Sequence, residues 1–228
     1  PRASRTIPFV SKATNIPLAR IAAQVSVGVT LDQFQLKPWE DNSHVAVKEA
    51  VLPFNKFPNE SIFLSPEMKS TGEVMGISKS LGEAFRKACI GAGNTLPKSG
   101  KVFISVNDMD KLGIISIARD FVELGFKLIG TENTANVLNK NGLSTQYVFK
   151  VGEGRPSIVD EIKNKKICLV INTPMGSRSR YDEEAIGRAC IRYGILAVTT
   201  LSGANAVLRA IRSTTLITKV RSLQEYHF

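Results

Sequence analysis

Five apolar segments alternate with five segments of helical periodicity between residues 101 and 228, and this alternation restricts the fold more than any other feature. The segments that we predict as strands are residues 102–106, 126–129, 146–149, 167–171 and 195–198. The segments that we predict as helices are residues 110–124, 132–141, 155–164, 182–193 and 203–212. Strands that alternate with helices of this length favour right-handed crossovers and helices on both faces of a sheet. The sequence therefore predicts an α/β, doubly wound fold with a five-stranded parallel sheet.

The first 93 residues do not have the pattern of a complete domain. We predict an extended stretch over Arg2–Val10, a helix over Leu18–Gly28, strands over Val45–Phe54 and Glu73–Ile77, and a helix over Ser80–Ala92. Gly, Pro and Ser are then frequent up to residue 100, which is typical of a linker. We therefore expect an incomplete α+β segment over residues 1–93, a linker over 94–100 and the parallel-sheet domain over 101–228.

The composition excludes several classes of protein. The net charge is +10, but the basic residues are spread over both halves of the chain, whereas nucleic-acid binders concentrate them on one face. The three cysteines each lie in an apolar run, which favours buried free thiols over disulfides. No apolar run is long enough to span a bilayer, and no signal peptide is visible. We expect a cytoplasmic protein with small anionic ligands and with no nucleic-acid or membrane partner.

Polar side chains follow every predicted strand of the sheet. They are Ser105, Asp108 and Lys111 after the first strand, Gly130, Thr131 and Thr134 after the second, Lys150 after the third, residues 172–178 after the fourth and residues 199–203 after the fifth. Ligands of doubly wound sheets bind at this edge, and free N–H groups at a helix N-terminus favour a phosphate. Each residue alone has a plainer explanation, since Thr131 could simply cap a helix. Together they predict a site for a phosphorylated ligand with a sugar or base.

The same edge lacks the residues of a common reaction centre. The sequence contains two histidines, His44 and His227, and neither follows a predicted strand of the sheet. Cys-His and Ser-His-Asp arrangements are therefore not available there, and a His-rich metal site is excluded. Asp108, Asp160 and Asp182 remain as candidate acids or bases, although carboxylates near helix starts are commonly solvated. The pattern favours a binding site over a catalytic one and predicts no metal ligands.

Long motifs resemble a known family over the whole chain. PRASRTIPFVSKATNIPLARIAA, VKEAVLPFNKFP and SPEMKSTGEVMG are similar to the end of the second ATP-grasp unit of carbamoyl phosphate synthetase large subunits. GTENTANVL, EGRPSIVDEI, LVINTPMG and TTLSGANAV resemble the C-terminal regulatory domain of that subunit, a relative of methylglyoxal synthase. The resemblance implies that residues 1–93 are the end of an ATP-grasp unit and that residues 101–228 are a methylglyoxal-synthase-like allosteric domain.

The resemblance also implies an activity for the complete protein. The family are ligases that make carbamoyl phosphate from bicarbonate, two ATP, and glutamine or ammonia, for pyrimidine and arginine biosynthesis. ATP and Mg or Mn are the cofactors, and the rest of the large subunit and a glutaminase small subunit are the partners. The family's metal ligands precede the motif at which this chain begins, so we interpret Pro1 as the edge of a fragment that has no cofactor and is inactive alone. Arg2 and Arg5 match arginines at the edge of the carbamate and ATP site.

Two effector sites follow from the same resemblance. The nucleotide site, for UMP or IMP, matches Ser105, Lys111, Thr131, Thr134, Lys150, Asn172, Thr173, Gly176 and Asp182, of which the two lysines with Thr131 and Thr134 hold the phosphate. Pro174 replaces a family Thr and removes a hydroxyl and a backbone donor, which favours UMP over IMP. Glu49 and Thr199 match an ornithine site, but Ala197 and Val198 replace more polar family residues there.

Two other functions stay open on the sequence alone. A lyase similar to methylglyoxal synthase, acting on a small phosphorylated substrate, would need a His at the phosphate and would leave residues 1–93 unexplained. A basic nucleic-acid-binding module would need clustered charge. The sequence predicts neither the sign of each effector nor the oligomeric state, so a homo-oligomer stays open.

Overall fold

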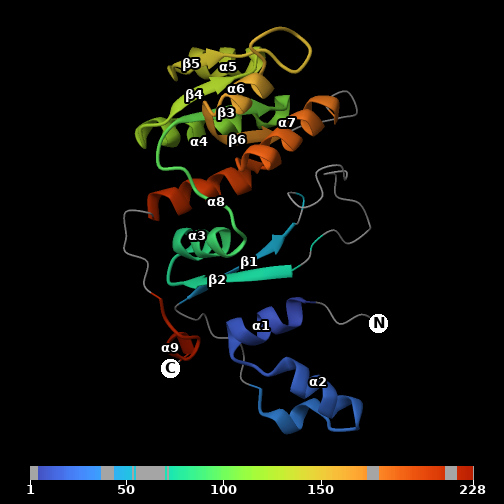
Figure 1. Ribbon diagram of the computed structural model, residues 1–228. Coiled ribbons are helices and arrows are strands. Elements are labelled where there is room, and N and C mark those ends of the chain that lie inside the picture. Colours follow the sequence, from blue (N-terminus) through green and yellow to red (C-terminus); the bar gives the residue numbers. More distant parts are fainter. Residues whose placement is uncertain are drawn as a thin grey trace.

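The computed structural model describes residues 5–36, 44–52, 54, 70, 72–173, 180–213 and 220–227. These residues form two sheets: an antiparallel pair of β1 (Val45–Val51) and β2 (Gly72–Ser78), and a parallel sheet of five strands. Figure 1 shows the parallel sheet and its helices at one end of the molecule, the β1–β2 pair in the middle, and the two N-terminal helices at the other end.

The parallel sheet has the order β5-β4-β3-β6-β7. Its strands are β3 (Lys101–Val106), β4 (Lys127–Gly130), β5 (Thr145–Tyr147), β6 (Ile167–Thr173) and β7 (Leu196–Val198), and all neighbours pair in parallel. The chain moves outward from β3 to β5 and then returns to the opposite side of β3 with β6. This order confirms the predicted doubly wound fold and puts the reversal of direction between β3 and β6.

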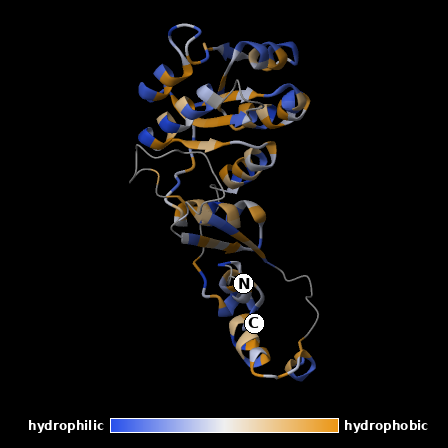
Figure 2. Ribbon diagram, turned by 90° about the vertical axis from the view of Figure 1, so that its right-hand side faces the viewer, coloured by the Kyte–Doolittle hydropathy of each residue, from blue (hydrophilic) through white to orange (hydrophobic). Residues whose placement is uncertain are grey.

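Helices cover both faces of this sheet. They are α4 (Lys111–Glu123), α5 (Glu132–Lys140), α6 (Ile158–Lys163), α7 (Arg180–Tyr193) and α8 (Leu201–Arg212), and the short η2 turn (Asp108–Asp110) precedes α4. Because side chains alternate along a strand, Ile104 packs with Phe121 of α4 and Leu208 of α8, whereas Phe103 packs with Ile158 of α6 and Ile186 of α7. Figure 2 shows strands dominated by hydrophobic residues, as expected for a sheet that is buried on both faces.

The N-terminal region contradicts one prediction. Residues 6–10, predicted as part of an extended stretch, belong to the helix α1 (Thr6–Thr14). Pro8 is the third residue of this helix, where a backbone N–H has no helical acceptor, so proline costs no hydrogen bond there. Asn15 ends the helix in the left-handed region with φ 59°. The next elements are α2 (Leu18–Ser26) and the η1 turn (Leu31–Phe34).

The helix α3 (Leu81–Gly91) lies between the β1–β2 pair and α8. Two glycines permit this close packing: a Cβ at Gly76 of β2 would overlap the backbone of Ala84, and a Cβ at Gly82 would lie 2.5 Å from the carbonyl oxygen of Arg209. Phe85 packs against the core of the parallel-sheet domain. The predicted linker at residues 94–100 follows α3 directly, and the domain boundary there stays a prediction.

The C-terminal helix α9 (Gln224–His227), which the sequence did not predict, packs back onto the N-terminal region. The Tyr226 hydroxyl donates to the carbonyl of Ile77 over 3.1 Å, and the His227 ring lies 2.8 Å from the carbonyl oxygen of Lys12. The His44 ring lies 2.9 Å from the carbonyl oxygen of Ala13. Both histidines therefore contact the last turn of α1.

Candidate functional site

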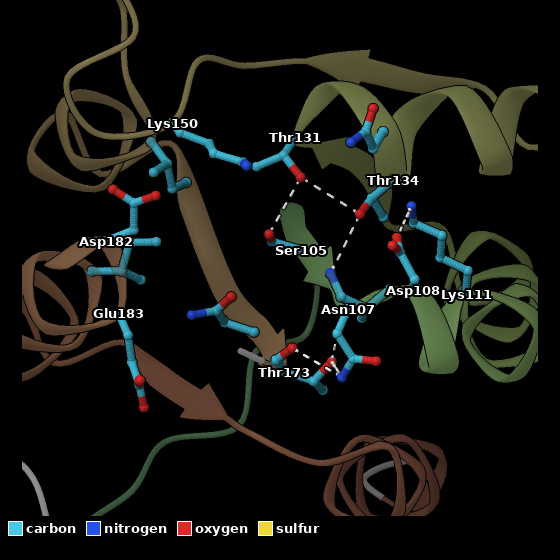
Figure 3. A pocket seen from close by; sticks show the side chains of 15 residues that line it. Ser105, Asn107, Asp108, Lys111, Thr131, Thr134, Lys150, Thr173, Asp182 and Glu183 are labelled. Atoms are coloured by element: carbon cyan, nitrogen blue, oxygen red, sulfur yellow. Dashed lines mark hydrogen bonds and ion pairs between the residues drawn. The ribbon is translucent and has the colours of Figure 1, made fainter. Parts of the chain in front are cut away.

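A cavity of about 320 Å³ opens at the carboxyl end of the parallel sheet, where the strand order reverses between β3 and β6. This volume lies in the range of small-molecule sites. Figure 3 shows side chains that converge on the cavity from the ends of several strands and the starts of the helices that follow them. The predicted effector residues that line it are Ser105, Lys111, Thr131, Thr134, Lys150, Asn172, Thr173 and Asp182. The ninth, Gly176, lies outside the described residues, as does Pro174.

Three hydroxyl groups form a connected cluster at the N-terminus of α5. The hydroxyl oxygens of Ser105 and Thr131 lie 3.2 Å apart, and Thr131 donates to Thr134 over 3.5 Å. The Val106 N–H donates to the Thr134 hydroxyl over 3.3 Å. Thr131 is the N-cap residue of α5 but makes no capping hydrogen bond with its side chain. Simple capping therefore does not explain this threonine, and its hydroxyl faces the cavity instead.

Gly130 allows these hydroxyls to reach the end of β3. It is the last residue of β4 and pairs with Ile104 of β3. A Cβ at this position would lie 2.9 Å from the carbonyl oxygen of Ile104, so any side chain would push the two strands apart. A glycine here keeps Thr131 and Thr134 close to Ser105.

Two lysines flank the hydroxyl cluster from opposite sides (Figure 3). Lys150, which follows β5, directs its ammonium group toward Thr131. Lys111, the first residue of α4, forms an ion pair with Asp108. The hydrogen bond and charge of Lys111 hold the pKa of Asp108 below its usual value. The Lys111 side chain is 20% exposed and the Asp108 side chain is 89% exposed, so the carboxylate stands at the mouth of the cavity.

The α7 side of the cavity is acidic, because Asp182 and Glu183 line it (Figure 3). Burial raises the pKa of Asp182, while the charge of Lys150 lowers it and that of Glu153 raises it. A cavity with ammonium and hydroxyl groups on one side and carboxylates on the other can hold an anion at one end of a ligand and hydrogen-bond donors at the other end.

Asn107 is a structural residue of the site that the sequence did not indicate. Its side-chain oxygen accepts from the N–H groups of Met109 over 2.9 Å and Asp110 over 3.1 Å, and its amide nitrogen donates to the Asp110 carboxylate over 2.8 Å. The same nitrogen lies 3.2 Å from the carbonyl oxygen of Thr173. Asn107 thus joins the ends of β3 and β6 and fixes the turn that carries Lys111. The Asn-x-x-Asp spacing is the signal that could have revealed it.

Several other candidates lie elsewhere. Arg2 lies outside the described residues, and Arg5 is exposed, with Nη1 3.5 Å from the Ser70 hydroxyl. Asp160, a candidate acid or base, forms the capping box of α6 with Ser157, whose hydrogen bonds lower the pKa of this carboxyl. It therefore supports the helix rather than the cavity.

The two residues of the predicted ornithine site lie in different environments. Glu49 on β1 is half-buried and accepts from the Asn94 side chain over 3.2 Å, and burial raises the pKa of its carboxyl. Thr199 is exposed and directly precedes Thr200, which caps α8. No described hydrogen bond joins Glu49 to Thr199, so this pairing stays a prediction.

The three cysteines are free thiols, of which Cys89 and Cys190 are buried as predicted and Cys168 is only partly buried. Burial raises the pKa of Cys89 and Cys190 to about 12 and that of Cys168 to about 11. Thiols with such pKa values are protonated and unreactive near neutral pH.

Among the described residues there is no group of three or more His, Cys, Asp or Glu side chains that could hold a metal ion. No helix of the described part of the chain is both long and apolar enough to cross a membrane.

Comparison with known proteins finds a matching family model, curated relatives and a solved structure. Residues 113–199 match the family model of the MGS-like domain. The chain is 51% identical over 99% of its length to the carbamoyl phosphate synthase large chain of Nostoc sp., and 49% identical over 100% to that of Archaeoglobus fulgidus. It covers 21% of each of these proteins, so it spans about one fifth of the length of its curated relatives. A solved methylglyoxal synthase from Elizabethkingia anophelis NUHP1 is 17% identical, with a TM-score of 0.42, over 50% of this chain and 79% of that one.

Proposed function

Because this chain belongs to the carbamoyl phosphate synthase large-chain family and corresponds to its C-terminal part, we propose that its MGS-like domain binds a nucleoside monophosphate that regulates carbamoyl phosphate synthesis. UMP is the first candidate ligand and IMP is the second. The complete protein is then an ATP-dependent ligase of the cytoplasm that serves pyrimidine and arginine biosynthesis and works with a glutaminase small subunit. In that protein residues 1–93 complete an ATP-grasp unit that uses ATP and Mg or Mn.

One observation carries the proposal: two lysines and three hydroxyls surround one end of a cavity at the switch point of a doubly wound sheet. A phosphate there would lie between the ammonium groups of Lys111 and Lys150, which bind it as point charges. Thr131 and Thr134 would add hydroxyl donors, and the N-terminus of α5 would add backbone donors and the positive end of its dipole. Charge-assisted hydrogen bonds of this kind are the strong ones.

The rest of the cavity suits the sugar and base of a nucleotide. Asn172, beside Ser105 in the sheet, and Asp182 of α7 also line the cavity and offer an amide and a carboxylate. The raised pKa of Asp182 means that burial penalises its charged form, and a donor from a ligand, such as a ribose hydroxyl, would offset that penalty. Ile158 and Ile186 supply apolar surface beside these groups.

A lyase function is the weaker alternative. A lyase similar to methylglyoxal synthase would need a histidine at the phosphate. Both histidines of this chain contact the last turn of α1 instead. Asn107 and Thr173 occupy the floor of the cavity and are hydrogen-bonded to each other. The cavity therefore offers a set of groups for binding and carboxylates at Asp108 and Asp182, but it lacks the histidine of that reaction.

Calorimetric titration of the whole chain with UMP, IMP and ornithine tests the proposal, and incubation with dihydroxyacetone phosphate tests the alternative. We expect saturable binding of UMP, weaker binding of IMP and no release of methylglyoxal. A second site, for ornithine, would use Glu49, and its binding should be independent of substitutions at Lys150. Absence of nucleotide binding would contradict the proposal, and turnover of dihydroxyacetone phosphate would support the lyase alternative.

A further inference from the structure

We infer that Asp108 is an internal competitor of the effector phosphate for Lys111 and so sets the affinity of the nucleotide site. This inference rests on the proposed function, because it concerns the same cavity. Asp108 is not among the residues that the family resemblance matched to the nucleotide site. It lines the cavity and pairs with Lys111, one of the two ammonium groups proposed to hold the phosphate (Figure 3).

The Asp108 carboxylate is not needed for the local fold. The backbone N–H groups of the η2 turn are satisfied by the side-chain oxygen of Asn107, and the Asn107 amide nitrogen donates to Asp110. The described contact of the Asp108 side chain is Lys111, and the carboxylate is otherwise surrounded by solvent. An exposed ion pair between residues three apart contributes little to stability. The effect of the Asp108 carboxylate is therefore its ion pair with Lys111.

The charges in the cavity indicate how the Asp108 carboxylate would affect phosphate binding. A phosphate near Thr131 and Lys111 would lie next to the Asp108 carboxylate, and the two anions would repel each other. Lys111 is mostly buried and has little freedom to move, whereas the exposed Asp108 can turn into solvent. The incoming phosphate would thus displace the carboxylate from Lys111, and the free energy of the ion pair would be subtracted from that of binding. Lys150, on the other side of the hydroxyl cluster, interacts electrostatically with Asp182 of α7, so the competition proposed here concerns Lys111 alone.

Asp108→Asn tests this inference, since asparagine keeps an oxygen acceptor for Lys111 and removes only the charge. We expect it to tighten UMP binding about twofold to fivefold at low salt, the scale of an exposed charge interaction. The gain should shrink at about 300 mM NaCl, because salt screens the interaction between exposed charges. Orthophosphate should show the same trend as UMP, because the competition concerns the phosphate alone.

Glu132→Gln is the matched control. Glu132 is exposed and directly follows Thr131, but it is not among the residues that line the cavity, so it tests for a general effect of net charge. We expect the control to change UMP affinity less than twofold. Asp108→Ala is a second variant, and circular dichroism monitors the fold of all three.

The outcomes separate this inference from the proposed function. If the wild-type chain binds UMP and both Asp108 variants bind it no more tightly, the inference is wrong and the proposed function stands. If Glu132→Gln tightens binding as much as Asp108→Asn does, a general charge effect replaces the specific competition. If the wild-type chain binds neither UMP nor orthophosphate, the proposed function fails and the inference fails with it.

Discussion

Substitution of Lys150 by methionine is the sharpest test of how the cavity would hold a phosphate. Lys150 directs its ammonium group toward Thr131, and the side chain is half-buried (Figure 3). Methionine keeps most of the apolar stem and removes the charge and the donors. The substitution should therefore weaken binding without opening a hole in the cavity wall.

The expected size of the effect follows from the environment of the ammonium group. A hydrogen bond to a charged group contributes about 1.5–3 kcal/mol, and the half-buried position of Lys150 favours the lower part of this range because solvent screens the charge. Each 1.4 kcal/mol corresponds to about a tenfold change in the dissociation constant. We expect Lys150→Met to weaken UMP binding by about tenfold to thirtyfold.

Isothermal titration calorimetry of the wild type, Lys150→Met and Lys140→Met measures this difference. Lys140 is the exposed last residue of α5, so its substitution removes the same charge away from the cavity. We expect Lys140→Met to bind UMP as the wild type does. Equal affinity of Lys150→Met and the wild type, with an unchanged circular dichroism spectrum, would show that the phosphate does not bind between Lys150 and Thr131.

Three further substitutions test other parts of the structure. Gly130→Ala should lower UMP affinity and reduce stability by about 1–3 kcal/mol, because its Cβ would press on the carbonyl of Ile104; calorimetry and urea unfolding measure both effects. Ser157→Ala should remove the cap of α6 and cost about 1 kcal/mol, seen as a lower thermal midpoint. Glu49→Gln should raise the thermal midpoint at pH 7, because burial raises the pKa of Glu49 and its charged form destabilises the fold. This gain should vanish below about pH 4.3, where the carboxyl is protonated in both folded and unfolded chains; a pH-independent difference would contradict it.

The parallel sheet and the cavity could be predicted because both depend on patterns that the chain repeats. Apolar strands that alternate with helices allow few arrangements, and the carboxyl ends of parallel strands meet at one edge. Ser105, Thr131 and Thr134 were therefore expected to lie together, and their hydroxyls do form a connected cluster. The prediction succeeded because Ser105 lies near the end of β3, Thr131 directly follows β4, and Thr134 lies in the first turn of α5.

The remaining features depend on contacts that local patterns do not encode. The prediction of an extended stretch was wrong for residues 6–10, which form the start of α1, and Pro8 lies in its first turn, where it costs no hydrogen bond. The role of Asn107 depends on Thr173, which is far away in the sequence and adjacent in the sheet. The pairing of Asp108 with Lys111 depends on the η2 turn, which was not predicted, since the predicted helix began at residue 110.

The most direct test of the central claim is a titration of the isotope-labelled chain with UMP, followed by backbone amide chemical shifts, with uridine as the control that lacks the phosphate. We predict saturable shifts at Val106, Thr131, Thr134 and Lys150, at the end of the sheet where β3 and β6 diverge, and much smaller shifts with uridine. Shifts confined to other parts of the chain, such as the surroundings of Glu49, or equal shifts with uridine, would contradict the claim that this cavity binds the phosphate of a nucleotide.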